Sequence, residues 1–295
     1  MKKKLFYIIL LIQLSFSEST YNILDFSFNA SSHSLHNGAI ASATKFLGIN
    51  PASLSTKKNH FEFSYFNLPA DIKSSNISLC WLNKKYIYFF KIHTTDYGLL
   101  KDDYNDTQFK AKDFSIELGQ KFEYKNLLSF GLSLGYIRST IHTYFSSGLY
   151  SNIGLRVNVL NERFSFGTSL NHSGFQIQTF IDNIEKLPTS FRCGISYSPM
   201  YVPVNIYIDF INYFADFYKK IHFGLDFKIK QKINFRISTV NNKRDLNTEQ
   251  YYKDILNNFS FGIGMNVKNK IFNLSIQNLG PVGIIYGFSI LNEFN

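Results

Sequence analysis

The chain has 295 residues, of which 17% are aromatic and 18% are charged, and its formal net charge is +10. Its mean hydropathy of −0.10 and the absence of any long apolar run after residue 20 exclude a bundle of membrane helices. The basic residues are spread over turns without a tight cluster, so we expect no nucleic-acid partner, while attraction to anionic surfaces such as lipopolysaccharide stays open.

The first residues have the three parts of a secretory leader. Lys2–Lys4 are basic, Leu5–Leu14 are almost wholly apolar, and Ser15–Ser17 offer small residues for cleavage. About ten apolar residues are too few to cross a bilayer, which takes about 20 in a helix. No cysteine lies near the cleavage region, which argues against a lipoprotein. The sequence therefore predicts a signal peptide over residues 1–17 and export of the rest.

Residues 18–59 do not alternate cleanly between apolar and polar positions. They include a run of small residues at Gly38–Ala43, and the segment is too short for a domain of its own. We expect it to form an N-terminal plug, tucked into or beneath the domain that comes after it.

From residue 60 to residue 295, apolar and polar residues alternate in segments bounded by turn residues. Phe130, Leu132 and Leu134, for example, alternate with Gly131 and Ser133. Such segments are typical of strands with one apolar face, and a membrane barrel turns that face to lipid. We predict an all-β fold, a transmembrane antiparallel barrel of about 14 strands. The strands should begin near Phe61, Asn76, Tyr86, Phe114, Leu128, Tyr150, Phe164, Ser190, Val204, Ile221, Asn234, Phe259, Ile271 and Val282.

The predicted connections fall into two classes. Those after the even strands are brief and rich in Lys and Asn, such as Asn83–Lys84 and Lys268–Lys270. Those after the odd strands are more often long, and we expect loops at 96–108, 173–187 and 241–254. Periplasmic turns of outer-membrane barrels are short and their external loops are long, so this sorting predicts two periplasmic termini.

The two cysteines lie at opposite phases of their strands. Cys80 alternates with Leu79 and Trp81, whereas Cys193 is in phase with the apolar Phe191. Residues in opposite phases point to opposite faces of a sheet, so we expect free thiols.

We find no motif for catalysis, nucleotides or metals, and expect neither an enzyme nor a cofactor. The chain has no phosphate-binding glycine loop and no G-x-S-x-G sequence. His33 and His36 are three residues apart but have no third ligand nearby in sequence, and we do not expect a metal there. Asp96, Asp102, Asp103 and Asp106 lack the spacing of a calcium loop, which favours a solvated loop. A barrel phospholipase or protease stays open in principle, because its catalytic groups can lie far apart in sequence.

One segment resembles a known motif, and the likeness continues along the chain. Gly48–Leu54 is similar to the Asn-Pro-Ala-x-Leu motif near the start of FadL-like barrels and of the PorV/PorQ family. Further similar segments occur in order over residues 21 to 215, at Asp96–Gly98, Phe109–Asp113, Tyr144–Leu149, Asn171–Gln176 and Leu187–Ser196. The chain resembles most closely the PorQ branch of that family, which belongs to the type IX secretion system.

The resemblance implies a FadL-like barrel of fourteen strands with a non-catalytic role in protein secretion and surface attachment. The implied partners are a sortase-like component and surface or periplasmic components of that machinery. Two departures put the partner contacts in doubt: Gly38-Ala39 stands where Gly-Gly is frequent, and Ser151-Asn152 stands where an Asp is common.

Four residues of the predicted plug are candidate site residues: Gly38, Asn50, Pro51 and Ala52. Asn50 and Pro51 suit a tight turn, because Asn bonds its own chain and Pro fixes φ, so we expect a structural role rather than ligand contact.

Two other functions stay open. A FadL-like transporter for hydrophobic small molecules fits the same motif and strand number, although the chain is short and its plug small for such a transporter. A soluble secreted β-protein would have to bury its apolar faces internally, and nothing in such a fold would sort the loops by length.

Overall fold

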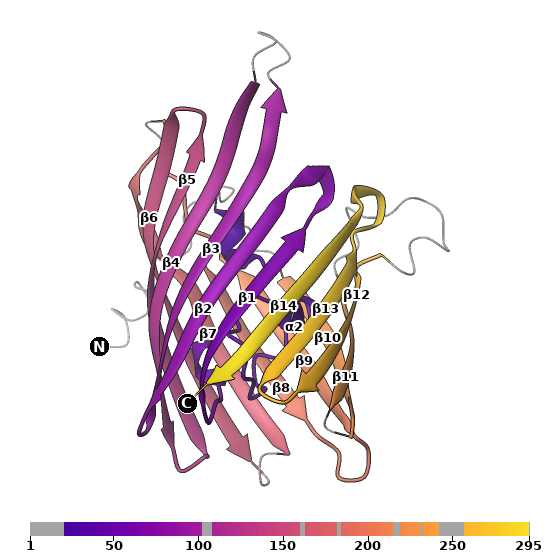
Figure 1. The fold of residues 1–295 in the computed structure, drawn as a ribbon. Helices are drawn as coiled ribbons and strands as arrows, with labels where there is room; N and C mark the ends of the chain where they lie inside the picture. The colour runs from indigo at the N-terminus through magenta and orange to yellow at the C-terminus, as the bar shows by residue number, and fades with distance from the viewer. Residues whose placement is uncertain are drawn as a thin grey trace, which may run out of the picture.

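The computed structural model describes residues 21–101, 108–159, 163–181, 184–214, 219–230, 232–241 and 257–294. These residues form a closed antiparallel barrel of 14 strands, in which each strand pairs with its neighbours in sequence and β1 pairs with β14 (Figure 1). The structure therefore confirms the predicted fold class and strand number. The predicted leader lies outside the described residues.

The strands are β1 (Asn59–Asn67), β2 (Lys73–Asn83), β3 (Tyr86–Lys101), β4 (Gln108–Tyr124), β5 (Leu128–Ile141), β6 (Tyr144–Val159), β7 (Phe164–Gln178), β8 (Ser190–Tyr197), β9 (Val204–Tyr213), β10 (Lys219–Ile229), β11 (Ile233–Val240), β12 (Phe259–Val267), β13 (Lys270–Asn278) and β14 (Ile284–Phe294). Most begin within three residues of the predicted positions. The exceptions are β4 and β6, which begin at Gln108 rather than Phe114 and at Tyr144 rather than Tyr150.

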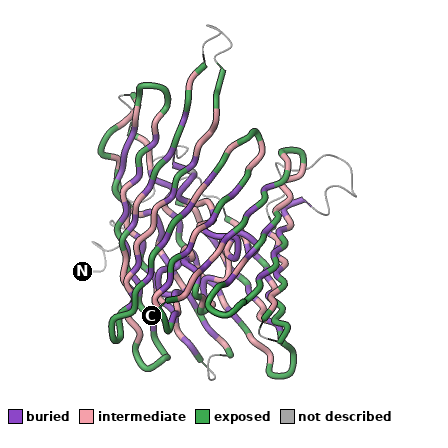
Figure 2. Tube along the Cα trace, viewed as in Figure 1, coloured by how far each residue is buried: buried purple, intermediate pink, exposed green. Residues whose placement is uncertain are grey.

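The alternation in sequence becomes an alternation between two surfaces (Figure 2). Along β5, Ser129 and Ser133 are 1% exposed and face the lumen, whereas Leu132 and Leu134 are exposed on the outside. An apolar exterior around a polar interior is the arrangement of a barrel in lipid, and the reverse of a soluble barrel. Aromatic rings gather near the turn between β2 and β3, where Trp81 stacks on Tyr88 with 5.8 Å between ring centroids. Such aromatic girdles mark the interface between lipid and water.

The wall of the barrel is not equally tall on all sides. Strands β3 to β7 have 14 to 17 residues, whereas β8 to β13 have 8 to 11. The tall hairpin of β3 and β4 rises above its neighbours at the top of Figure 1, the end where the longer connections lie. We call the opposite end, which bears the short connections, the turn-side end.

Two of the three predicted long loops were wrong in extent. Strand β3 continues to Lys101 and pairs with β4 from Gln108, so the described residues of the predicted loop 96–108 belong to the two strands. Strand β7 likewise continues to Gln178, inside the predicted loop 173–187. Residues 242–256, within which most of the predicted loop 241–254 falls, lie outside the described residues. So do Asp102, Asp103 and Asp106 of the acidic loop.

Both errors have the same physical cause, a β-bulge built from residues that usually mark turns. Tyr97 and Gly98, with Gly98 at φ +76°, bulge out of β3 opposite β4. Asn171 and His172, with His172 at φ +54°, bulge out of β7 opposite β6. A bulge inserts one residue and shifts the phase of the strand beyond it. The bulge in β7 thereby turns two consecutive side chains, Asn171 and His172, into the interior.

The N-terminal segment, residues 21–58, runs inside the barrel and enters β1 at the turn-side end. It contains the 3-10 helix η1 (Asn22–Asp25), the short helix α2 (Ala30–His33) and the 3-10 helix η2 (Pro51–Ser53). Two further 3-10 turns, η3 (Pro69–Asp71) and η5 (Gly280–Val282), lie between strands. Among the described residues, no helix combines the length and the apolarity needed to cross a bilayer.

Both cysteines are free thiols and lie on opposite faces of the wall, as expected from their phases. Cys80 is fully buried among Leu47, Leu54 and Phe89, where the N-terminal segment meets the wall. All six prolines lie outside the strands, as a closed hydrogen-bonded sheet requires.

Candidate functional site: the plugged lumen

The N-terminal segment closes the lumen, and Asn50 is at the centre of one of its attachments. Asn50 is 1% exposed and caps η2, accepting a hydrogen bond from the Ala52 amide at 2.9 Å. Its side-chain amide donates to the carbonyl of Ile40 at 2.9 Å and to that of Leu155 in β6 at 3.5 Å. One side chain thus shapes the turn at Pro51, joins two parts of the plug and ties them to the wall.

Two glycines of the wall make room for this attachment. A Cβ atom on Gly154 would lie 2.0 Å from the Asn50 Oδ1 atom, and one on Gly131 would lie 2.4 Å from the Pro51 carbonyl carbon. No side chain fits there without displacing the plug, because real Cβ atoms essentially never approach another heavy atom within 3.0 Å. The sequence-predicted residues Asn50, Pro51 and Ala52 therefore sit where β5 and β6 present bare backbone.

Gly38, the fourth predicted residue, lies at a second attachment. The Asp209 carboxylate of β9 accepts hydrogen bonds from the amides of Ala39 and Ile40, at 2.5 and 3.1 Å. A Cβ atom on Gly38 would lie 2.7 Å from Asp209 Oδ2, so a glycine permits this approach. Ala39 has a φ of +61°, in the left-handed region that non-glycine residues seldom adopt, and in this conformation its amide points toward the carboxylate.

A third attachment ties α2 to the part of the barrel formed by the short strands β8 to β13, which we call the shorter wall. Ser238 of β11 donates to the carbonyl of Ser34 at 2.8 Å, and Ser260 of β12 donates to the carbonyl of His33 at 3.0 Å. The His33 Nδ1 atom is 3.0 Å from the Ser275 hydroxyl of β13. Burial lowers the pKa of His33 to about 3, an effect to which His36 adds, so the imidazole is neutral at physiological pH.

An ion pair holds the start of the plug against β8. Arg192, 1% exposed, donates to Asp25 at 2.8 Å, and the inward-turned His172 lies 3.7 Å from the same oxygen. A buried arginine needs such a partner, because an unpaired charge away from water is costly. Sequence reasoning missed this pair, whose members are 167 positions apart.

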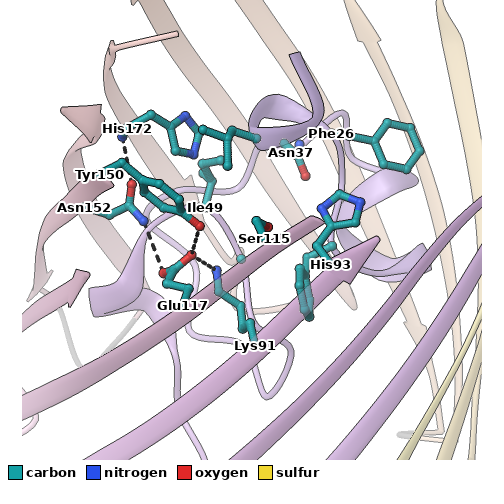
Figure 3. Close-up of a pocket in the computed structure, with 13 residues that line it drawn as sticks. Phe26, Asn37, Ile49, Lys91, His93, Ser115, Glu117, Tyr150, Asn152 and His172 are labelled. Atoms are coloured by element: carbon teal, nitrogen blue, oxygen red, sulfur yellow. Dashed lines mark hydrogen bonds and ion pairs between the residues drawn. The ribbon is translucent and has the colours of Figure 1, made fainter. Parts of the chain in front are cut away.

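A polar cluster lies where the plug faces β3, β4 and β6 (Figure 3). The Glu117 carboxylate lies 2.9 Å from the Lys91 ammonium and accepts hydrogen bonds from Asn152 at 3.1 Å and Tyr150 at 3.4 Å. Asn152 in turn accepts from the His172 amide at 2.8 Å. The pocket in their midst has only about 40 Å³, enough for water but not for a substrate. With its carboxylate oxygens engaged by three donors, Glu117 serves as a cross-link within the wall.

Two larger cavities lie along the shorter wall. The outer cavity, of about 400 Å³, is lined by the apolar Phe26, Val240 and Ile285, by Lys220 and His222, and by the ion-paired Arg192 and Asp25. All of these except residues of the N-terminal segment, such as Phe26, belong to the ends of their strands that face the longer connections. The cavity therefore has both apolar and polar lining residues, and the two kinds lie side by side: Val240 is the cross-strand partner of His222.

The inner cavity, of about 430 Å³, opens at the turn-side end. Phe46, Tyr207 and Ile271 are among its apolar lining, and Asp226 and Arg236 are among its charged lining. Each cavity is of the size of a small-molecule pocket.

The segment Ala30–Ile40 separates the two cavities. Ser31, Leu35 and Gly38 line the inner cavity, whereas His33, His36 and Asn37 of the same segment line the outer one. These eleven residues of the plug, which we call the septum, thus block passage along the shorter wall.

The described residues contain no group of three or more potential metal ligands in one place. His33 and His36, which are three residues apart in the sequence, contact different strands. His33 contacts Ser275 of β13, and His36 contacts Ser238 of β11 at 2.7 Å. The residues that hold the plug were foreseen only at Asn50–Ala52 and Gly38. The other residues that hold the plug could have been suspected from charged side chains at lumen-facing positions in the middle of strands, such as Glu117 and Asp209. Buried charged side chains are rare unless they have a partner.

No protein-family profile and no curated protein sequence matches the chain. Among solved structures, it is similar to the toluene transporter TodX of Pseudomonas putida, with a TM-score of 0.65, 12% identity, and coverage of 92% of this chain and 99% of that chain. The toluene transporter TbuX of Ralstonia pickettii gives a TM-score of 0.63 at 12% identity, again over 92% and 99%. A FadL homologue of Pseudomonas aeruginosa gives 0.55 at 9% identity, over the same shares.

The fold is that of FadL-like outer-membrane barrels. At these identities the likeness concerns the fold alone, and it agrees with the strand count from the sequence.

Proposed function

We propose that this protein is an outer-membrane barrel for the passage of small hydrophobic molecules that carry a polar or anionic group. The observation that carries the proposal is the pair of cavities on the two sides of the septum. The outer cavity offers apolar side chains together with the Lys220 ammonium and the Arg192–Asp25 ion pair, which suits a ligand with an apolar body and a polar or negative end. The proposal assigns no catalytic step to the protein.

The neighbours in fold support this direction. TodX and TbuX are named as toluene transporters, so a barrel of this architecture is compatible with the passage of small aromatic molecules. The proposal places the barrel in the outer membrane with its turn-side end and both termini in the periplasm, because the short connections lie at that end.

The test is uptake of labelled benzoate, which has an apolar ring and a carboxylate, by cells that produce the barrel, with labelled toluene, which lacks the polar group, as the comparison. Val240→Trp fills the outer cavity and should reduce uptake at least fivefold. Val267→Trp makes the same change on the lipid-facing side of β12 and should leave uptake unchanged. Uptake that equals that of cells without the barrel, or that is insensitive to Val240→Trp, would contradict the proposal.

A second candidate function is a scaffold of the type IX secretion and attachment machinery. The ordered resemblance to the PorV/PorQ family over residues 21 to 215 favours it, as does a plug tied to the wall at several points. This candidate predicts that sortase-like and surface or periplasmic components co-purify with the barrel after gentle crosslinking. A barrel recovered alone in that experiment would count against it.

A further inference from the structure

The turn-side end of the barrel is strongly basic. Basic side chains are exposed in its connections and at the neighbouring strand positions, among them Lys84, Lys125, Lys228, Lys230, Lys268 and Lys270. In the described part of this end, the two partly exposed acidic side chains are already paired. Glu123 binds the buried Lys121 at 2.6 Å, and Glu293 binds Lys45. The positive charge of this end is therefore not balanced locally.

One connection at this end differs from the others. The β8–β9 connection exposes Met200, Tyr201 and Val202, with Tyr201 90% exposed. The other short connections are built mainly of Lys and Asn. Exposed apolar residues beside one another at a polar end are a common mark of an interaction site.

The exposed residues are held in place from both sides. The Lys228 amide of β10 donates to the carbonyl of Pro203 at 2.8 Å, and the Ser198 amide donates to the carbonyl of Arg163 at 2.8 Å. Ser198 also bonds the Asn205 side chain at 2.6 Å. Because both ends of the connection are anchored, its apolar side chains are presented with little conformational entropy to lose on binding.

Beside this connection lies a groove of about 480 Å³. Met200, Tyr201 and Val202 form one side, and Lys228 and Lys230 line the other. Neither lysine has a carboxylate partner among the described residues. An apolar surface bordered by two such ammonium groups is complementary to an apolar side chain flanked by carboxylates.

The position of the groove argues for a protein rather than for lipid. Asn205 and Lys228 line both the groove and the inner cavity, so the groove opens toward the mouth of the lumen. Lys228 is in phase with the lumen-facing Asp226, not with the lipid-facing Phe227. A lipid headgroup borders the outside of the wall and does not reach this position.

We propose that the groove between the β8–β9 connection and Lys228–Lys230 is the docking site for a periplasmic protein segment with an apolar or aromatic side chain flanked by Asp or Glu. The apolar side chain packs against Met200, Tyr201 and Val202, and the carboxylates lie at the two lysines. This docking is independent of the passage of small molecules and does not require it.

The test is site-specific photo-crosslinking in cells that produce the full-length barrel, with benzoylphenylalanine in place of Tyr201. We expect one major protein adduct whose crosslinked peptide, mapped by mass spectrometry, carries acidic residues beside an apolar one. The double charge reversal Lys228→Glu and Lys230→Glu should weaken the adduct at least tenfold. The same reversal at Lys268 and Lys270 should change it less than twofold, and the probe at the exposed Leu127 should give no such adduct.

Several outcomes would overturn the proposal: an adduct with phospholipid, an adduct with a second copy of this chain, no adduct, or an adduct insensitive to the reversal at Lys228 and Lys230. Heat-modifiability on gels confirms that each variant is a folded barrel. Tyr201→Ser separates the two proposals, because it should abolish docking while uptake of small molecules is unchanged. Failure of uptake with intact docking would contradict the passage proposal alone.

Discussion

Asp209→Asn tests whether the carboxylate of β9 holds the septum in place. The carboxylate accepts hydrogen bonds from two backbone amides, those of Ala39 and Ile40. An asparagine keeps one acceptor oxygen and replaces the other with an NH₂ group. The NH₂ group would face the backbone N–H of Ala39 or Ile40, and two donors cannot form a hydrogen bond with each other. Hydrogen bonds to charged groups contribute about 1.5–3 kcal/mol each, so the variant should destabilise the docked septum by about 2–3 kcal/mol.

A loss of that size raises the opening equilibrium of the septum roughly 30- to 150-fold, since about 1.4 kcal/mol corresponds to a factor of ten. An opposing effect exists, because the variant no longer buries a carboxylate that is 1% exposed. We expect the lost acceptor to dominate, because the two amides bond no other acceptor among the described residues in the closed state and would remain buried without a partner.

The assay is hydrogen exchange, followed by mass spectrometry, of the peptide that contains Ala39 and Ile40. Their exchange should accelerate by the same factor, while exchange in β5 and β6 stays slow. Asp226→Asn is the matched control, because Asp226 also faces the lumen but bonds Asn234 at 3.1 Å and Arg236 at 3.6 Å rather than the plug. Unchanged or slower exchange at the two amides, or equal acceleration in both variants, would refute the reasoning.

Three other experiments address the plug and the wall. Asn50→Ala removes the cap of η2 and the bond to Ile40, and should lower the stability of the docked plug by about 1–2 kcal/mol, measured as faster proteolysis of the N-terminal segment in the folded barrel. Burial lowers the pKa of His33 to about 3 and that of His36 to about 4. Their contribution to docking is full above pH ~6.5 and is lost as the pH falls toward 4. The opening equilibrium of the septum, obtained by dividing the measured hydrogen exchange by the intrinsic amide exchange rate at each pH, should therefore rise over that interval and stay constant above it. Cys193 is partly exposed on the outer face and Cys80 is buried, so a maleimide added to the detergent-solubilised barrel should label the first thiol faster than the second, and both at similar rates once the barrel is unfolded.

The wall of the barrel was predictable because its information is local. In a strand, neighbouring side chains face opposite surfaces, so an apolar exterior and a polar lumen leave an alternation that any window of the sequence shows. Short turns of Lys and Asn then mark the strand ends. Phe130 to Tyr136 is one such window, and β5 was placed to the residue at its start.

The plug and the bulges were not predictable because their causes are not local. Gly98 and Asn171 are residue types of turns, and only pairing with β4 and β6 shows that they continue a strand. Ala39 and Asp209 are 170 positions apart, and nothing in either neighbourhood indicates the other. Asn50–Ala52 was found because a tight turn has a local signature, but its seat on Gly131 and Gly154 depends on the closed barrel.

The attachments of the plug differ in kind, and this difference indicates which one can release. At Pro51 and Ala52 the backbone occupies space that wall glycines leave free, so withdrawal would open a void that nothing fills. At the septum, by contrast, the contacts are hydrogen bonds from Ser238 and Ser260 and to Asp209, whose donors and acceptors water from the adjoining cavities can satisfy once the septum moves, so that release leaves no void. We therefore expect a path between the two cavities to open by movement of the septum while the plug stays anchored at Asn50.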